Sequence, residues 1–208
     1  LDEVEEAMYY DIVKQRLEIV EKFERLTDEN ALEKTLQKYL FEHLWLLDPA
    51  WDRVDPPLME KSIAKILNDK SKPKDRVDIK YRVTGTDHVL VELKRADVVT
   101  DSYELAKQVR KYRVPILEHL RGQEGRDVDL QVVCVVGRDL SDWKGSDNGR
   151  RESAELLRAG STKVVTYSHL IRNAKQSYSD YLAASQSIAS LRAVVERIEN
   201  RLASDAAE

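Results

Sequence analysis

Three ionisable side chains on two short segments have the types and spacing needed for metal-assisted chemistry. Asp78 lies in the segment 76–83, and Glu92 and Lys94 lie in the segment 88–95. Both segments alternate apolar and polar residues, which is typical of β-strands whose alternate side chains share one face. Glu92 and Lys94 are therefore expected on the same face of their strand.

The stretch that joins the two segments, Thr84-Gly85-Thr86, predicts the turn of a β-hairpin. A turn centred on Gly85 pairs residues whose numbers sum to 170, which places Asp78 directly opposite Glu92. Cross-strand neighbours have Cβ atoms roughly 5 Å apart, close enough for two carboxylates to bind one divalent ion. A shift of one residue would turn Asp78 to the other face, so the prediction depends on this register.

Two carboxylates at this separation repel each other unless a cation lies between them, and the cation that oxygen ligands favour is most often Mg²⁺ or Mn²⁺. Such an ion polarises a phosphoryl oxygen and lowers the pKa of a bound water. Lys94 could orient or deprotonate that water and neutralise charge that develops at phosphorus. The alternative is a surface hairpin on which Asp78, Glu92 and Lys94 form cross-strand salt bridges.

The order of these residues resembles the motif of the PD-(D/E)XK nuclease superfamily, an Asp on one strand and Glu-x-Lys on the next. The matching stretches are Arg76-Val77-Asp78-Ile79 and Val89-Leu90-Val91-Glu92-Leu93-Lys94-Arg95. Downstream, Gln108-Val109-Arg110-Lys111-Tyr112 resembles the Gln-x-x-x-Tyr element of the RecB-like branch. Gln108 and Tyr112 are four residues apart and share a face of the expected helix. The resemblance implies that both support catalysis, and the alternative is an ordinary half-buried helix face.

A segment upstream of the hairpin, Leu32-Glu33-Lys34-Thr35-Leu36-Gln37-Lys38-Tyr39-Leu40, resembles the Glu-x-x-x-Gln-x-x-Leu helix of the Shedu-type (DUF4263-like) branch. The resemblance implies that Glu33 completes a metal site formed with Asp78, Glu92 and Leu93. Glu33 also fits a capping box with Asn30, and that alternative stays open. The resemblance covers roughly residues 30 to 170 and lacks the proline that often precedes the catalytic Asp.

Helical and strand-like periodicities alternate along the chain. They predict helices over 4–26, 30–47, 101–121, 152–159 and 169–203, strands over 76–83, 88–95, 130–136 and 163–167, and either state over 58–67. The continuous apolar run from Leu130 to Val136 predicts a central buried strand. We therefore expect an α/β fold with a central mixed β-sheet flanked by helices, restriction-endonuclease-like in type, with helical extensions at both ends.

The domain organisation follows from the same pattern. We predict an N-terminal helical extension over 1–29, a nuclease-like domain over 30–170 and a C-terminal helix over 171–208. Apolar residues at heptad-like steps in the last segment predict that the terminal helices pack on each other or form a homo-oligomer. The chain opens on Leu1, so we expect a piece of a longer protein with other domains.

Composition limits the function classes. The formal net charge of −4 excludes a domain that holds nucleic acid by overall basicity, although local clusters such as Lys107, Arg110, Lys111 and Arg113 could contact phosphates. No run of about 18 apolar residues occurs, so we expect no membrane partner and a cytoplasmic location. Cys134 is the only cysteine, which excludes an internal disulfide and predicts a buried side chain. His88 is expected at the surface, and Trp143 half-buried.

The resemblance and the residue pattern together predict a Mg²⁺- or Mn²⁺-dependent endonuclease that hydrolyses DNA. Its expected catalytic residues are Asp78, Glu92, Lys94, Gln108, Tyr112 and Glu33. The resemblance to Shedu-type proteins implies a role in bacterial defence against phage or foreign DNA. The alternatives are a catalytically silent module of the same fold, used for oligomerisation or partner docking, and a helical regulatory protein with an unrelated hairpin.

Overall fold

The computed structural model describes residues 3–47, 58–62, 66, 76–84, 86–143, 147–180 and 183. The chain divides into two compact units. One unit is Lys22–Ile171, and the other combines Leu1–Glu21 with Arg172–Glu208. The sequence predicted boundaries at 29/30 and 170/171. Every candidate site residue lies in the unit Lys22–Ile171, whose architecture therefore decides the geometry of the site.

A mixed five-stranded β-sheet forms the centre of this unit, in the order β1-β2-β3-β4-β5. The strands are β1 (Leu58–Ser62), β2 (Arg76–Thr84), β3 (Asp87–Leu93), β4 (Asp129–Val136) and β5 (Thr162–Thr166). Strand β2 runs antiparallel to both β1 and β3, whereas β3, β4 and β5 are parallel to one another. The expected α/β class with a central mixed sheet is confirmed, and the arrangement is consistent with a restriction-endonuclease-like fold. The segment 58–67, left open above, begins as a strand.

The register of the β2–β3 hairpin is the one predicted. Ile79 pairs with Val91, Lys80 with Leu90, Tyr81 with Val89 and Arg82 with His88, and each pair of numbers sums to 170. The register shifts by one between Arg82 and Thr84, next to the turn. Gly85 lies outside the described residues. Asp78 and Glu92 are the next positions along this register.

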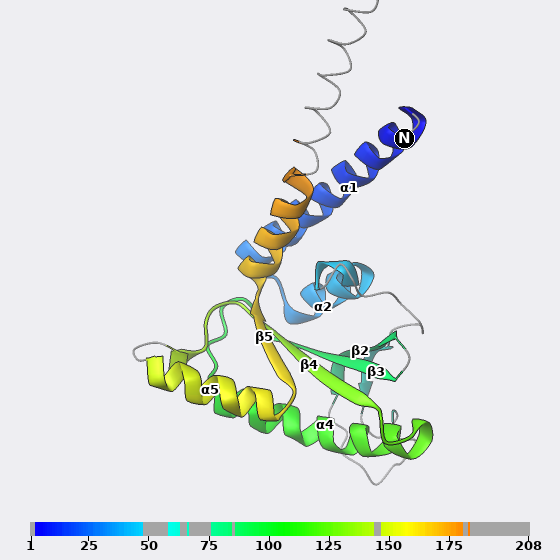
Figure 1. Ribbon diagram of the computed structural model, residues 1–208. Helices are drawn as coiled ribbons and strands as arrows, with labels where there is room; N and C mark the ends of the chain where they lie inside the picture. The colour runs from blue at the N-terminus through cyan, green and yellow to red at the C-terminus, as the bar shows by residue number, and fades with distance from the viewer. Residues whose placement is uncertain are drawn as a thin grey trace, which may run out of the picture. The chain divides into compact units, whose positions relative to one another are not determined.

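Helices cover both faces of the sheet (Figure 1). Helices α4 (Ser102–Glu124) and α5 (Asp147–Ala159) lie on one face, and α2 (Glu33–Glu42) lies on the other. Because β3 and β4 are parallel, the chain must cross over between them, and α4 makes this connection. Asp101 caps α4 by accepting a hydrogen bond from the Glu104 N–H at 2.8 Å.

The apolar core fills the space between the sheet and α4. It contains alternate residues of β3 and β4 together with one stripe of α4, chiefly Leu90, Val132, Cys134, Val136, Leu105, Val109, Tyr112 and Ile116. Strand β4 pairs with β3 on one side and β5 on the other, so the prediction of a central buried strand is confirmed. The Cys134 side chain is fully buried, as expected. Trp143 is partly buried against this core, also as expected.

The capping box predicted at Asn30 and Glu33 is wrong. Asn30 has a φ of 51°, in the left-handed region, and ends α1 (Glu3–Asp28). The N–H of Ala31 donates to Leu26 O and that of Asn30 to Thr27 O, which is the pattern of a Schellman motif. Helix α2 therefore starts without a side-chain cap at Glu33.

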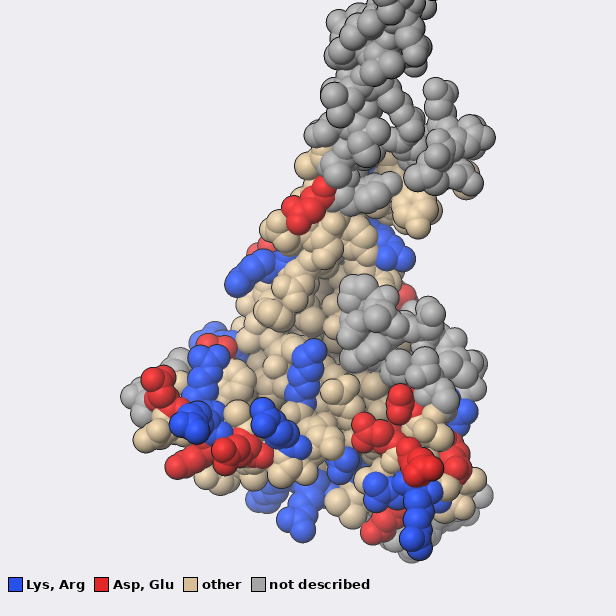
Figure 2. Space-filling view, in the orientation of Figure 1, with Lys and Arg blue, Asp and Glu red and all other residues tan. Residues whose placement is uncertain are grey.

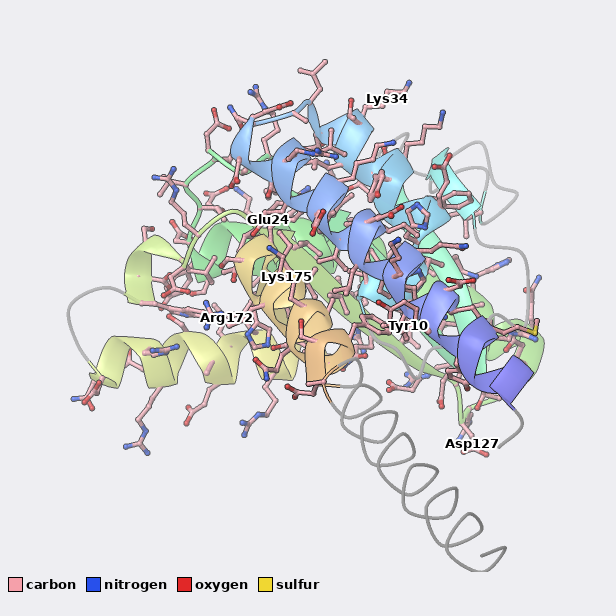
Figure 3. All side chains as sticks on the ribbon, turned by 90° about the horizontal axis from the view of Figure 1, so that it is seen from above. Tyr10, Glu24, Lys34, Asp127, Arg172 and Lys175 are labelled. Atoms are coloured by element: carbon pink, nitrogen blue, oxygen red, sulfur yellow. The ribbon has the colours of Figure 1, made fainter. Side chains whose placement is uncertain are left out.

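The buried stripe of α2 is consequently shorter than predicted. Leu32 precedes the helix and is 66% exposed, whereas Leu36, Leu40, Leu44 and Leu47 are buried as expected. The last two belong to or follow the 3₁₀ turn Leu44–Leu46. Lys34, on the opposite side of α2, is exposed and lies at the outer edge of the view in Figure 3. The stripe directs Gln37, which is 3% exposed, toward β2.

His88 is buried, which contradicts the expectation of a surface histidine. It is 2% exposed, and its Nε2 atom lies 3.0 Å from Glu124 Oε2. Strand β3 is paired on both sides, and its even-numbered residues face α4, whose last turn supplies Glu124. An alternating sequence does not reveal which strand is internal, so this burial could not be predicted.

The smaller unit contains the start of α1 and the beginning of the C-terminal segment. Residues 167–180 are helical, and Arg16 donates a hydrogen bond to the Tyr178 hydroxyl within this unit. Most of the predicted C-terminal helix, including its heptad-like positions, lies outside the described residues. Over the described ranges, no helix combines the length and the apolarity needed to span a membrane.

Gly137 lies directly after β4, where the backbone packs closely against Ala96. A Cβ atom there would lie 1.8 Å from the Ala96 carbonyl oxygen, so the backbone would have to move. We expect Gly137→Ala to lower the free energy of unfolding by about 2–3 kcal/mol, measured by urea denaturation. Gly122→Ala is the matched control, because Gly122 lies within α4 with nothing near its Cβ position. The control should be neutral or slightly stabilising, and equal losses in both variants would contradict the prediction.

Candidate active site

Asp78 is held where the β2–β3 ladder ends. Its Oδ2 atom accepts a hydrogen bond from the Leu93 N–H at 2.7 Å. From the other face of the sheet, Gln37 Nε2 donates to the Asp78 main-chain oxygen at 2.8 Å and more weakly to Oδ1 at 3.3 Å. These contacts fix both the backbone and the carboxylate of Asp78 beside β3.

Glu92 lies on the face of β3 that is covered by α4, and it is 5% exposed. Its Oε1 atom accepts hydrogen bonds from Lys94 Nζ at 3.0 Å and from Gln108 Nε2. Its Oε2 atom lies 3.4 Å from the Tyr112 hydroxyl. The two α4 residues predicted from their four-residue spacing thus meet the same carboxylate.

Lys94 is anchored through both its backbone and its ammonium group. Its N–H donates to Val135 O at 2.9 Å, and its carbonyl accepts from the Tyr167 hydroxyl at 2.8 Å. The Nζ atom donates to Glu92 and, at 2.8 Å, to Gln108 Oε1. Gln108 therefore bridges the two side chains: its amide oxygen accepts from Lys94, and its amide nitrogen donates to Glu92.

The two carboxylates are costly to charge in this environment. Burial raises the pKa of Asp78 to about 7, and the negative charge of Glu92 adds to the rise, against the Leu93 hydrogen bond and the Lys94 charge. Burial also raises the pKa of Glu92, while the charge and the hydrogen bond of Lys94 oppose that rise. A cation bound between the carboxylates would stabilise the charged form of both.

Glu33 lies near this pair without joining it in a three-carboxylate cluster. Its charge raises the pKa values of Asp78 and Glu92, which places it in their electrostatic environment. Within the part of the chain that the structure describes, no three His, Cys, Asp or Glu side chains are grouped closely enough to hold a metal ion. The role of Glu33 as a metal ligand therefore stays a prediction.

Leu93 was also expected at the metal. Its side chain is apolar and fully buried, so only its main-chain carbonyl could bind a cation. Its N–H group binds the Asp78 carboxylate instead and positions that carboxylate. The contact shown by the structure is therefore one that orients the Asp78 carboxylate.

Two residues of this network were not selected from the sequence. Gln37 was recognised only as part of the Glu-x-x-x-Gln pattern, although its i, i+4 relation to Glu33 indicated a shared helix face. Tyr167 carried no sequence signal, because it follows β5 and meets Lys94 only through the fold. Its burial, at 2% exposure, and its hydroxyl contact make it part of the support of Lys94.

The surface of this unit carries charges of both signs. Figure 2 shows lysine and arginine side chains interspersed with carboxylates over the part of the molecule formed by α4 and α5. This mixture agrees with the net charge of −4. Any contact with a polyanion therefore has to be local.

The raised pKa of Asp78 predicts how stability depends on pH when no metal is bound. Its unfolded value is 3.8, so between about pH 4 and 7 the folded protein binds more protons than the unfolded chain, and its free energy of unfolding falls as the pH rises. Asp78→Asn should therefore be more stable than the parent by about 1–3 kcal/mol at pH 8 and by much less at pH 4.

Urea unfolding at both pH values in EDTA measures this difference. Adding Mg²⁺ at pH 8 should stabilise the parent and not Asp78→Asn, because a ligand stabilises only the state that binds it. A difference between the two proteins that does not change with pH would contradict the assignment.

No family model and no curated protein matches the chain. Among solved structures, the chain is similar to the protein in the structure of the EndoMS-dsDNA2 complex, with 17% sequence identity and a TM-score of 0.36. The match covers 62% of this chain and 41% of that one, so this chain spans less than half the length of its structural neighbour. The function proposed below rests on the geometry of the site.

Proposed function

We propose that the protein is a metal-dependent nuclease domain that hydrolyses DNA phosphodiester bonds. The observation that carries this proposal is a buried carboxylate, Glu92, and a half-buried one, Asp78, on adjacent strands, with Lys94 hydrogen-bonded to Glu92. A surface hairpin with ordinary salt bridges would not bury Glu92 to 5% exposure. It would also not hold the carboxylate with three donors from two elements.

The donor set of this site fits Mg²⁺ or Mn²⁺. Both ions prefer carboxylate oxygens, and Mg²⁺ is usually held by one or two carboxylates together with water and substrate phosphates. Asp78 and Glu92 would hold the ion, with the Leu93 carbonyl and Glu33 as further candidates. When bound, the ion would polarise the scissile phosphate and lower the pKa of a coordinated water.

Lys94 would stabilise negative charge on the substrate. Its ammonium group has three N–H donors, of which two are engaged by Glu92 and Gln108. The third is left to donate to a phosphoryl oxygen, where a fixed positive charge lowers the barrier as charge develops. Gln108 acts as a positioning residue, because it fixes Lys94 and Glu92 relative to each other.

The resemblance to Shedu-type proteins supports a further step, that cleavage serves defence against phage or foreign DNA within a longer bacterial protein in the cytoplasm. The resemblance rests on Glu33 and Gln37 in α2, of which Gln37 reaches the site directly. In the alternative hypothesis, the same fold serves only oligomerisation or partner docking. The hydrogen-bond network around Lys94 favours catalysis over that alternative.

The proposal is tested by nicking of supercoiled plasmid in Mg²⁺ or Mn²⁺. We expect Lys94→Ala and Glu92→Ala to reduce the cleavage rate by about 10²–10⁴-fold, because each removes a charge from the reacting centre. Glu118→Gln, a change at an exposed position of α4, should leave the rate unchanged. EDTA should abolish cleavage by the parent.

The docking hypothesis predicts no cleavage of DNA. If the parent, alone and within its longer protein, cuts neither duplex nor single-stranded DNA in either metal, the nuclease assignment fails. Cleavage that survives in Lys94→Ala at the parent rate would indicate a contaminating nuclease and would also count against the site. Circular dichroism and thermal unfolding of each variant separate a lost fold from a lost activity.

A further inference from the structure

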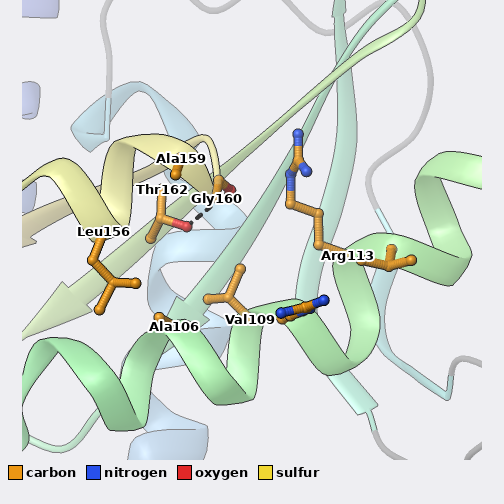
Figure 4. A pocket seen from close by; sticks show the side chains of 9 residues that line it. Ala106, Val109, Arg113, Leu156, Ala159, Gly160 and Thr162 are labelled. Carbon is orange, nitrogen blue, oxygen red and sulfur yellow. Dashed lines mark hydrogen bonds between the residues drawn. The ribbon is translucent and has the colours of Figure 1, made fainter.

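A cavity lies on this unit, between α4 and α5, and none of the candidate catalytic residues lines it. Its volume is about 250 Å³. Ala106, Val109 and Leu156 supply apolar wall, and the turn at Gly160 and the start of β5 at Thr162 close another side (Figure 4). The cavity is thus built by two helices and a strand end.

The charged groups that line this cavity are both cationic. Arg110 and Arg113 contribute to the wall, and no Asp, Glu or His does. Arg110 is exposed and has no hydrogen bond or ion pair with any residue in the described ranges. Arg113 has the Asp129 carboxylate in its electrostatic environment, whereas Arg110 has no such partner among the described residues, so Arg110 is the cation whose charge an anion in the cavity would neutralise.

Arg113 is held in place before any ligand arrives. Its Nε donates to Leu130 O and its Nη2 to Ser161 Oγ, each at 2.9 Å. These bonds use two of the five guanidinium donors, so the others remain for a ligand. Ser161 has a φ of 48°, an uncommon value for a serine, so the turn that holds Arg113 has a specific backbone shape. A preorganised cation loses little freedom on binding.

We propose that this cavity binds a nucleotide through its phosphate and its base. A phosphate monoester carries close to two negative charges near neutral pH, which matches two arginines better than a carboxylate does. The apolar walls formed by Ala106, Val109 and Leu156 suit the face of a nucleobase. The volume lies just below the roughly 300–1,000 Å³ of common ligand pockets, so a single nucleotide would fill the site while part of it stays exposed.

The nucleotide could be free or could be the phosphorylated end of a strand. Both present the same chemistry to Arg110 and Arg113. The site is separate from the network of Asp78, Glu92 and Lys94, so its existence does not depend on nuclease activity. Its ligand would contact α4, whose other face carries Gln108 and Tyr112 to Glu92.

Isothermal titration of the chain with dAMP, deoxyadenosine and inorganic phosphate, all in EDTA, tests the proposal. We expect dAMP to bind about tenfold or more tightly than either fragment, because only dAMP uses both the cations and the apolar walls. Arg110→Gln should weaken dAMP binding by about tenfold or more. Ala159→Leu, which places a larger side chain in the lining, should also weaken it while keeping both arginines.

Lys107→Gln is the matched control, because Lys107 is an exposed cation on the same helix outside the cavity lining. It should bind dAMP as the parent does. Competition by a 5′-phosphorylated oligonucleotide, and not by its unphosphorylated form, would assign the strand end as ligand, and lack of competition would assign the free nucleotide.

Three results would overturn the proposal. They are no heat of binding with millimolar dAMP, equal affinity for phosphate and dAMP, and equal loss in Lys107→Gln and Arg110→Gln. Because these are binding measurements without metal, they are independent of the plasmid assay. A failed nuclease assignment and a failed nucleotide site are thereby distinguished.

Discussion

Burial of the Glu92 carboxylate is the constraint on which the rest of the structure depends. A charged group on an internal strand loses its hydration, and it is tolerated only when donors replace water. Strand β3 is paired on both sides, so these donors must come from the next residues of the strand and from the covering helix. Lys94, Gln108 and Tyr112 meet this requirement. The position of α4 over the sheet is therefore as much an electrostatic necessity as a hydrophobic one.

Helix α4 contributes side chains both to the apolar core and to the candidate site. One stripe of α4 packs on β3 and β4 through Leu105, Val109 and Ile116, and the adjoining positions carry Gln108 and Tyr112. A register shift of α4 would thus expose apolar surface and at the same time leave Glu92 without donors, which costs roughly 1–3 kcal/mol per unsatisfied group. This coupling selects a single arrangement of the helix. It also explains why the side chains at the ends of β2 and β3 are held in one geometry.

The parts of the fold that follow from local periodicity could be predicted from the sequence, and the parts that depend on neighbouring elements could not. Alternation and turn chemistry were enough to give the hairpin register from Ile79–Val91 to Arg82–His88, which Asp78 and Glu92 would extend by one position. The spacing of Gln108 and Tyr112 was enough to place both on one helix face. Asn30, by contrast, suits both a helix start and a left-handed helix end, and only the path between α1 and α2 decides between them. His88 and Tyr167 acquire their partners from α4 and β3, which sequence spacing does not bring together.

The site is held from both faces of the sheet, and this has a mechanical consequence. Gln37 of α2 fixes Asp78 from one side, and Gln108 of α4 fixes Glu92 from the other. The Leu93 N–H donates a hydrogen bond to Asp78 and so ties the Asp78 carboxylate to the strand that carries Glu92. Because the donor is a backbone group of a paired strand, its position is fixed, and the Asp78 carboxylate can turn away only by giving up this hydrogen bond. The negative charge of Glu92 contributes to the raised pKa of Asp78, so a proton on Asp78 or a nearby cation would relieve the repulsion between the two carboxylates.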